Sequence, residues 1–215
     1  MSPASTEKNT RAGRRRRPDG ELSRQRILDA ATEIAAERGY EGTSIGAVSA
    51  KCGLPASSIY WHFKDKDDLI AAVIERSFGS WLEAWEMPTD LTNPDEAFAS
   101  LCRRIAKALL DSPDFIRIGL MLALERRPVE PRGREMFVEV RDDVYRRILA
   151  TIRTWAPELT DGDVHQLATY AIAGADGLFI AKEIGGDTVD LISMFDMHAH
   201  AVFAMGQRLI EQHGM

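Results

Sequence analysis

The sequence predicts an all-α protein, and two observations support this. Apolar residues recur at intervals of three and four along most of the 215-residue chain, as on the buried face of an amphipathic helix. No stretch of alternating apolar and polar residues, which would indicate a half-buried strand, stands out. We therefore expect about nine helices, arranged as a three-helix head over residues 23–68 and a larger helical domain over residues 69–215.

Residues 1–22 are expected to form a basic, flexible arm ahead of the head. Residues 1–20 consist largely of Ser, Pro, Gly and Arg and contain almost no apolar residues, a composition that favours disorder. Basic residues cluster here with no acid between them, namely Lys8, Arg11, Arg14, Arg15, Arg16 and Arg17. The cluster fits either a solubilising tail or an arm that follows the minor groove or backbone of DNA.

The first helix of the head is expected from about Ser23 to Arg38. Ile27 and Ile34 lie at helical spacing on its apolar face. Gly39 is expected to end the helix, because glycine leaves the helical conformation without steric cost.

Two further helices of the head flank a tight turn. The second follows Thr43 or Ser44, either of which could cap its N-terminus. The third spans about residues 56–63. Gly53 marks the turn, since a helix can end there in a left-handed residue. Pro55 suits the start of the third helix, where its missing N–H is not needed.

The third helix carries side chains suited to a DNA major groove. Small hydroxyls at its start can reach base edges, while aromatic and basic groups at its end can hold phosphates. We therefore expect DNA contacts from the helix-turn-helix and from the arm, namely Thr43, Ser44, Ala56, Ser57, Ser58, Tyr60, Trp61, His62, Lys66, Arg14, Arg15, Arg16 and Arg17.

This helix-turn-helix resembles that of the TetR family of bacterial transcriptional regulators, over residues 23–69. The family spacing is kept without a gap at Thr43, Ser44, Val48, Cys52, Gly53, Leu54, Ile59, Tyr60, His62, Phe63, Lys66 and Leu69. Pro55 and Ser57 stand where the family usually has Ser and Gly. These departures are expected to alter which operator is read, rather than whether DNA is bound.

The resemblance implies a biological role. A TetR-like protein is expected to be a homodimer that binds an inverted-repeat operator in double-stranded DNA. It is expected to act as a repressor that a small-molecule effector releases by binding the larger domain. Two alternatives stay open: a regulator whose large domain binds a protein partner, and an architectural DNA binder with no ligand.

Charge is distributed unevenly along the chain. The net charge is −6. Residues 1–64 hold 11 Lys/Arg and 7 Asp/Glu, a balance of +4, while the remaining residues hold 16 and 26, a balance of −10. A basic head on an acidic body predicts that only one end of the molecule approaches phosphate.

The larger domain is expected to contain six helices. The first begins near Asp65–Asp68 and carries Leu69 and Ile70 on an apolar stripe that braces the head. The others are expected over about residues 95–110, 114–124, 134–155, 161–183 and 190–212, with a turn at residues 185–187.

This domain is also expected to hold a mostly apolar or aromatic effector. Its aromatic and Met side chains could line a cavity, although each alone is more often plain core. Asp176 lies inside an apolar run, so we expect it either to be paired or to supply a polar contact in the cavity. The candidate ligand-binding residues are Trp81, Trp85, Phe98, Phe115, Met121, Phe137, Tyr145, Tyr170 and Asp176.

The last two helices are expected to form the dimer interface, as half of a four-helix bundle. Small residues in the first favour close helix contact, and the second has more apolar surface than one neighbouring helix needs. The alternative is that the last helix is an internal core helix. The candidate interface residues are Ala171, Gly174, Gly177, Phe195, Val202 and Phe203.

No cofactor, metal site or catalytic centre is expected. Asp196, His198 and His200 form a D-x-H-x-H pattern, but on a helix only residues 196 and 200 share a face. Cys52 and Cys102 lack metal-ligand or redox spacing, so we expect packing residues of a reduced, cytoplasmic protein. No apolar run approaches the ~18 residues of a membrane span. Phosphate loops and nucleophile motifs are missing from the sequence, which argues against an enzyme.

Overall fold

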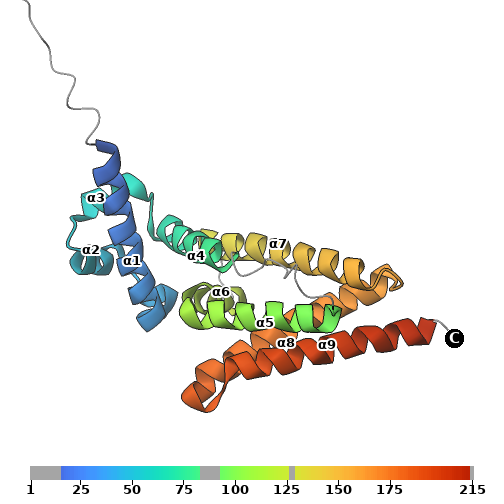
Figure 1. Cartoon of the computed structure of the whole chain (residues 1–215). Coiled ribbons are helices and arrows are strands. Elements are labelled where there is room, and N and C mark those ends of the chain that lie inside the picture. The colour runs from blue at the N-terminus through green and yellow to red at the C-terminus, as the bar shows by residue number, and fades with distance from the viewer. Residues whose placement is uncertain (1–15, 83–92, 126–128, 214–215) are drawn as a thin grey trace, which may run out of the picture. The chain divides into compact units, whose positions relative to one another are not determined.

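The computed structural model describes residues 16–82, 93–125 and 129–213. These ranges contain nine α-helices and one short 3-10 helix, so the all-α prediction is confirmed over them (Figure 1). The chain divides into two compact units, Met1–Val73 and Ile74–Met215. The division falls inside α4 (Lys66–Leu82), slightly beyond the boundary expected after residue 68. None of the helices in the described ranges combines the length and the apolar character that a membrane span requires.

The head unit contains α1 (Arg16–Gly42), α2 (Ile45–Cys52), α3 (Ala56–His62) and the first residues of α4. Each helix contributes apolar side chains that are fully or almost fully buried, including Ile27, Leu28, Ile34, Val48, Ile59, Phe63, Leu69 and Ile70. Burial of this shared core fixes the faces of α1 to α3, and therefore fixes which face of α3 is exposed.

Helix α1 begins at Arg16, so the expectation of a flexible segment up to residue 22 is wrong for residues 16–22. Pro18 is tolerated because it falls in the first turn, where backbone N–H groups have no helical partner. Ser23 lies inside the helix, and its hydroxyl donates to the Asp19 carbonyl over 2.8 Å. Gly39, with φ of 68°, interrupts the helix as predicted.

The larger unit contains the rest of α4 followed by α5 (Pro94–Asp111), α6 (Asp114–Leu124), α7 (Arg132–Trp155), α8 (Asp161–Gly185), η2 (Gly186–Thr188) and α9 (Leu191–His213). The expected bounds of α5 to α9 are confirmed to within a few residues. Helix α9 packs against both α5 and α8, and α7 packs against α6 and α8 (Figure 1).

Local capping explains why two of these helices begin where the sequence indicates. The Asn93 side chain accepts a hydrogen bond from the Asp95 N–H over 3.0 Å, with Pro94 at the first helical position of α5. At α8, the Thr160 hydroxyl oxygen accepts from the Asp163 N–H over 3.3 Å, and the Asp163 carboxylate accepts from the Thr160 N–H over 3.2 Å. This reciprocal pair satisfies two donors at the helix start.

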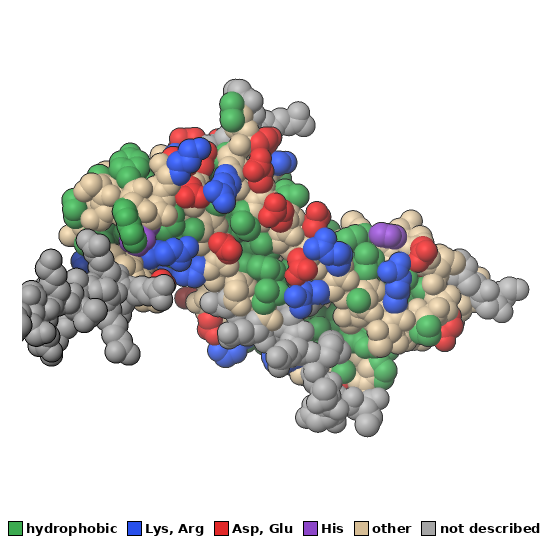
Figure 2. All heavy atoms as spheres, turned by 90° about the horizontal axis from the view of Figure 1, so that it is seen from above, with side chains coloured by type: hydrophobic (Ala, Val, Ile, Leu, Met, Phe, Trp, Pro, Cys, Tyr) green, Lys and Arg blue, Asp and Glu red, His purple; other side chains and the backbone are tan. Residues whose placement is uncertain are grey.

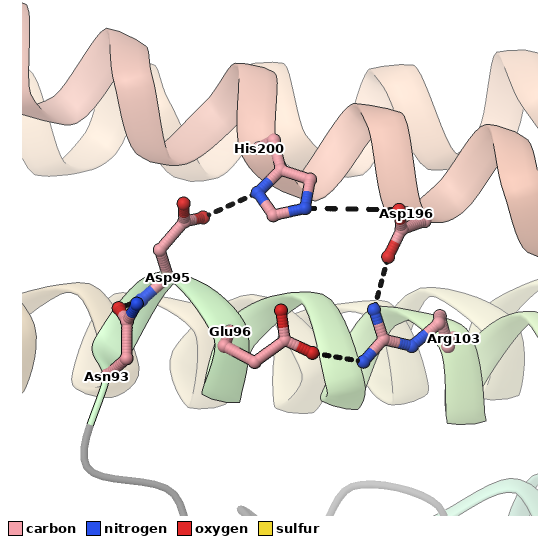
Figure 3. Close-up of polar contacts among 6 residues, drawn as sticks. All are labelled: Asn93, Asp95, Glu96, Arg103, Asp196 and His200. Carbon is pink, nitrogen blue, oxygen red and sulfur yellow. Dashed lines mark hydrogen bonds and ion pairs between the residues drawn. The ribbon is translucent and has the colours of Figure 1, made fainter.

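Polar side chains join α5 to α9 (Figure 3). Arg103 pairs with Glu96 on its own helix at 2.6 Å and with Asp196 on α9. Nδ1 of His200 lies 2.8 Å from Oδ1 of Asp95, and its Nε2 lies 3.9 Å from Oδ2 of Asp196. Asp196 and His200 therefore share the face of α9 that meets α5, as their spacing predicts.

Candidate DNA-binding head and ligand cavity

Helix α3 presents polar and aromatic side chains on its open face. Tyr60 is 57% exposed and Trp61 is 76% exposed, and Ser57 is also exposed. Ile59 and Phe63 are buried on the opposite face and anchor the helix in the head. The open face of α3 therefore presents Ser57, Tyr60 and Trp61 to solvent.

The turn before α3 is held by three specific interactions. Gly53 is left-handed, with φ of 67° and ψ of 23°, and its N–H donates to the Ser49 carbonyl over 3.0 Å. The Ser49 hydroxyl donates to the Leu54 carbonyl over 2.7 Å. The Arg26 guanidinium on α1 donates to the Cys52 carbonyl over 2.7 Å. These contacts orient α3 by satisfying carbonyls at the end of α2 and in the turn.

Thr43 and Ser44 take different roles at the start of α2. Ser44 is the cap, because its hydroxyl oxygen accepts from the Ala47 N–H over 3.1 Å, and its side chain is exposed. Thr43 is 1% exposed, and its hydroxyl donates to the Gly39 carbonyl over 2.9 Å. The expectation that the Thr43 side chain contacts DNA is therefore wrong, because that side chain packs into the turn after α1.

Lys66 is held inside the head. Its ammonium group donates to the Tyr40 carbonyl over 3.2 Å, lies 4.0 Å from the centroid of the Tyr40 ring and is 3.7 Å from a Glu41 carboxylate oxygen. This placement corrects the expectation that Lys66 is free to hold a phosphate. Lys64, which the sequence reasoning did not select, is exposed just after α3.

A shallow groove separates the open face of α3 from the start of α1. It is lined by Asp19, Gly20, Ser23, Ser57, Ser58, Trp61 and His62. The Trp61 ring lies beside Gly20, since a Cβ at residue 20 would be 3.8 Å from it. Burial, followed by the nearby Arg24, lowers the pKa of His62. The lowered pKa favours the neutral imidazole of His62 in the absence of DNA.

The predicted arm residues fall largely outside the described structure. Arg14 and Arg15 lie outside the described residues, as do the side chains of Arg16 and Arg17. In the described part of the head, the basic side chains do not form a uniformly positive surface. Lys51, for example, pairs with Glu33 at 2.6 Å. On the face shown in Figure 2, Lys and Arg side chains lie among Asp and Glu side chains.

An apolar cavity lies within the larger unit, with walls from α4, α5, α6, α7, α8 and α9. It encloses about 860 Å³, counting the space at its mouth. Trp81, Phe98, Phe115 and Asp176 line it, as predicted. The Trp81 and Phe115 rings form one continuous wall, with centroids 5.7 Å apart.

An ion pair stands at the wall of this cavity. The two terminal nitrogens of Arg141 on α7 donate to the two carboxylate oxygens of Asp176 on α8, over 2.9 Å and 2.5 Å. Burial raises the pKa of Asp176, and the Arg141 charge opposes that rise. Asp176 is therefore paired, and it also lines the cavity. The sequence could not identify Arg141 as its partner, since the two are 35 residues apart.

Four other predicted ligand residues do not line the cavity. Met121 and Tyr170 are exposed on other surfaces. Phe137 is buried behind the wall, with its ring centroid 5.6 Å from that of Phe115. The Tyr145 hydroxyl is turned away, 2.9 Å from Nδ1 of His165. The remaining candidate, Trp85, lies outside the described residues.

Several predicted dimer residues are instead part of the chain's own core. Phe195 is 2% exposed, and both Phe195 and Ala171 line the cavity. Val202 is buried in an apolar cluster, and Phe203 is partly buried beside it in a smaller hollow. Burial within the chain corrects the prediction for Ala171, Phe195 and Val202, because helical periodicity identifies a buried face but not the chain that covers it.

Gly174 and Gly177, also predicted at the interface, have different surroundings. A Cβ at Gly174 would lie 2.2 Å from the His198 ring, so this glycine serves packing within the chain. His198 is half-buried, its Nε2 lies 2.9 Å from the Ala171 carbonyl oxygen, and it lines the cavity. Nothing lies within 4 Å of a Cβ added at Gly177.

The open faces of α8 and α9 carry exposed apolar side chains. On α8, Tyr170, Ile180 and Ile184 follow helical spacing, with the small residues Ala173 and Gly177 between them. Met197 and Met205 lie on the open face of α9. We call these seven residues the α8/α9 face.

A glycine-capped turn followed by a helix with an open polar face defines a helix-turn-helix protein. Residues 27–73 match the family model described as bacterial regulatory proteins, tetR family. The head of the chain is therefore similar to the N-terminal domain of the TetR family of transcriptional regulators, in agreement with the resemblance found in the sequence.

Curated relatives extend this agreement. The HTH-type transcriptional regulator AcrR of Shigella flexneri is 38% identical over 64 residues, which cover 30% of each chain. The fatty acid metabolism regulator protein of Bacillus subtilis is 29% identical over 108 residues, covering 49% of this chain and 55% of that protein. The chain thus spans about half or less of the length of these relatives. Both relatives are named as regulators.

Solved structures show the same fold over most of the chain. The fatty acid degradation regulator FadR from Bacillus halodurans gives a TM-score of 0.69 at 15% identity, covering 92% of this chain and 96% of that one. SmeT, the repressor of the Stenotrophomonas maltophilia multidrug efflux pump SmeDEF, gives 0.67 at 20% identity, covering 87% and 91%.

Proposed function

We propose that the protein is a repressor that binds an inverted-repeat operator through α3. The observation that carries this proposal is the open face of α3, where Ser57, Tyr60 and Trp61 are exposed while Ile59 and Phe63 fix the helix from behind. Small hydroxyls read base edges, and aromatic groups at the rim contact the backbone. Relatives named as repressors, such as Rv1353c of Mycobacterium tuberculosis, support this direction of regulation.

Two heads are needed to read an inverted repeat, and we propose that the α8/α9 face joins them. Ile184 is 83% exposed, and Met197 and Tyr170 are each more than half exposed. Ala173 and Gly177 would let a second copy approach closely along α8. This face replaces the interface that the sequence predicted at Phe195 and Val202.

The cavity is proposed as the effector site. Its walls are apolar and aromatic, and it is enclosed by six helices of one unit, which suits a small molecule better than a protein partner. Trp81 at the wall lies on α4, and the first residues of that helix belong to the head unit. A ligand that favours a form with lower operator affinity would shift the population toward that form.

The direct test of operator binding is selection from random duplexes with the full chain. The selected sequence should be an inverted repeat that binds ~10³-fold or more tightly than a scrambled duplex of equal composition at the same salt concentration. A ratio near one would favour the architectural alternative, in which DNA is held without sequence preference. Removal of residues 1–15 in the same assay tests the arm, because a contacting arm steepens the salt dependence.

A further inference from the structure

The charged groups at the cavity wall are already matched to each other. Two nitrogens of Arg141 donate to the two carboxylate oxygens of Asp176, at 2.9 Å and 2.5 Å. Their side chains are 24% and 21% exposed, so the pair is partly withdrawn from water. Among the described lining residues they are the only Asp, Glu, Lys or Arg side chains. The ion pair therefore leaves the cavity wall without net charge from these residues.

A charged ligand would either divide this pair or, by sharing one partner, place a second charge of the same sign beside the other. A carboxylate that takes Arg141 leaves Asp176 without its cation, and an ammonium that takes Asp176 leaves Arg141 without its anion. Loss of one partner from a buried pair is strongly unfavourable, because the remaining charge stays desolvated. Partial exposure weakens the effect here but does not remove it.

An uncharged polar group can bind without dividing the pair. Each terminal nitrogen of Arg141 keeps a second N–H, and each oxygen of Asp176 keeps lone pairs beyond those that bond to Arg141. A hydroxyl can accept from the first and donate to the second at once. Thr151 and His198 also line the cavity, and the other lining residues, including Trp81, Phe98 and Phe115, offer apolar and aromatic surface to the body of such a ligand.

We infer that the effector is an uncharged apolar or aromatic molecule with one hydroxyl-like polar group, which lies against the Arg141–Asp176 pair. The inference rests on the proposed effector role of the cavity and narrows the chemistry of that effector. Fatty acids and cationic amphiphiles are excluded as preferred ligands of the wild-type cavity.

Matched ligand series test the inference on the full-length protein without DNA. One series is decanol, decanoate and decylamine, and the other is 2-naphthylmethanol, 2-naphthoate and 2-naphthylmethylamine. Calorimetric titration at about pH 8, where imidazole groups are ordinarily neutral, compares the three head groups on one apolar body. In at least one series the alcohol should bind at least ~10-fold more tightly than either ion.

Removing one member of the pair should change which head group binds best, toward the carboxylate in one variant and toward the amine in the other. Asp176→Asn removes the counter-ion of Arg141 and should raise the relative affinity for the carboxylate about 10-fold or more. Arg141→Met should do the same for the amine. Asp143→Asn is the matched control, because Asp143 pairs with Arg147 at 2.9 Å on the same helix but does not line the cavity. This control variant should leave the order of affinities for the alcohol, the carboxylate and the amine unchanged.

The possible outcomes separate this inference from the proposed function. Tighter binding of either ion to the wild type, or an unchanged order in both variants, would overturn the inference. Failure of all six compounds to bind would also overturn it, without bearing on operator binding. If the alcohol binds as expected but operator affinity does not respond, the inference stands and the sensing role fails. Circular dichroism of both variants confirms folding, and the wild-type comparison decides alone if neither variant folds.

Discussion

The imidazole of His198 on α9 occupies the space beside Gly174 on α8. A Cβ atom at residue 174 would lie 2.2 Å from Cε1 of that ring, well inside van der Waals contact. The ring is also held by its contact with the Ala171 carbonyl oxygen at 2.9 Å. The packing of the last two helices therefore depends on glycine at this one position.

Gly174→Ala should consequently lower the unfolding free energy by ~1–3 kcal/mol, since the added methyl must displace a fixed ring. Denaturant titration measures this effect. Gly79→Ala on α4 is the matched control, because nothing lies within 4 Å of a Cβ added there. It should stabilise the protein by up to ~1 kcal/mol through helix propensity. Equal effects of the two substitutions would contradict the packing of His198 against α8.

Ser57 and Lys64 should affect DNA binding in different ways. Ser57 is exposed on α3, so Ser57→Ala should change base preference by ~1–3 kcal/mol at one operator position. Lys64 is exposed beyond the helix end, so Lys64→Ala should weaken all duplexes alike and reduce the salt slope by about 1 for each phosphate that the lysine neutralises. Selection and salt titration separate the two effects. Base preference that is identical to wild type in Ser57→Ala would remove this serine from readout.

If the α8/α9 face joins two copies of the chain, a charged residue placed on it should give a folded monomer. Met197 is 59% exposed, so Met197→Glu should leave the chain folded while it weakens the symmetric contact. Sedimentation at micromolar concentration should show a dimeric wild type and a monomeric variant with unchanged helicity. Leu124→Glu, at a residue that is 76% exposed on α6, is the control and should stay dimeric.

Phe195→Glu should behave differently from Met197→Glu. Phe195 is buried within the chain, so an unpaired carboxylate there should destabilise the fold itself by more than ~4 kcal/mol. Loss of helical signal, rather than clean dissociation, is the expected result. A folded Phe195→Glu monomer would instead restore Phe195 to the interface.

Asp176 gives stability a pH dependence of defined sign. Burial raises its folded pKa above the unfolded value of ~3.9, so the folded protein binds more protons between the two values. The unfolding free energy of the wild type, relative to that of Asp176→Asn, should therefore fall as pH rises above ~4. Denaturant titrations of both proteins from about pH 3.5 to about pH 6 measure this difference.

Asp143 supplies a control of opposite sign. Hydrogen bonding and charge from Arg147, followed by Arg146, lower the pKa of Asp143. Its contribution to stability is present above the unfolded pKa and is lost as pH falls through the lower, folded value. The unfolding free energy of the wild type, relative to that of Asp143→Asn, should therefore increase as pH rises through that interval. If the stability difference between wild type and variant changed with pH in the same direction for Asp176→Asn and for Asp143→Asn, the pKa directions of the two residues would be contradicted.

Local signals were sufficient to predict most of the helices. A helix was expected from about residue 161, where the structure shows Thr160 and Asp163 capping α8, and Gly53 marks the turn before α3 as expected. These features act over a few residues, so the sequence contains them in full. The start of α1 was missed because Ser23, a typical cap, bonds to a carbonyl inside the helix instead.

Long-range partners could not be predicted in the same way. Periodicity placed Phe195 on an apolar face, but only the packed structure shows that this face covers the chain's own cavity. Arg141 carries no local sign that it pairs with Asp176. Thr43 belongs to the family motif, yet its hydroxyl is used within the head. Part of the motif therefore preserves the fold of the head rather than its contact with DNA.

The link between the cavity and the head is tested most directly by operator affinity in the presence of cavity ligands. Compounds that raise the thermal stability of the full-length protein are first selected from a broad metabolite and drug library, and each is then titrated against the operator complex. At least one should weaken operator binding by ~100-fold, corresponding to ~3 kcal/mol of coupling, and Phe115→Ala in the cavity wall should reduce the response without abolishing DNA binding. If every compound that binds the larger unit leaves operator affinity unchanged, the effector role of the cavity is wrong.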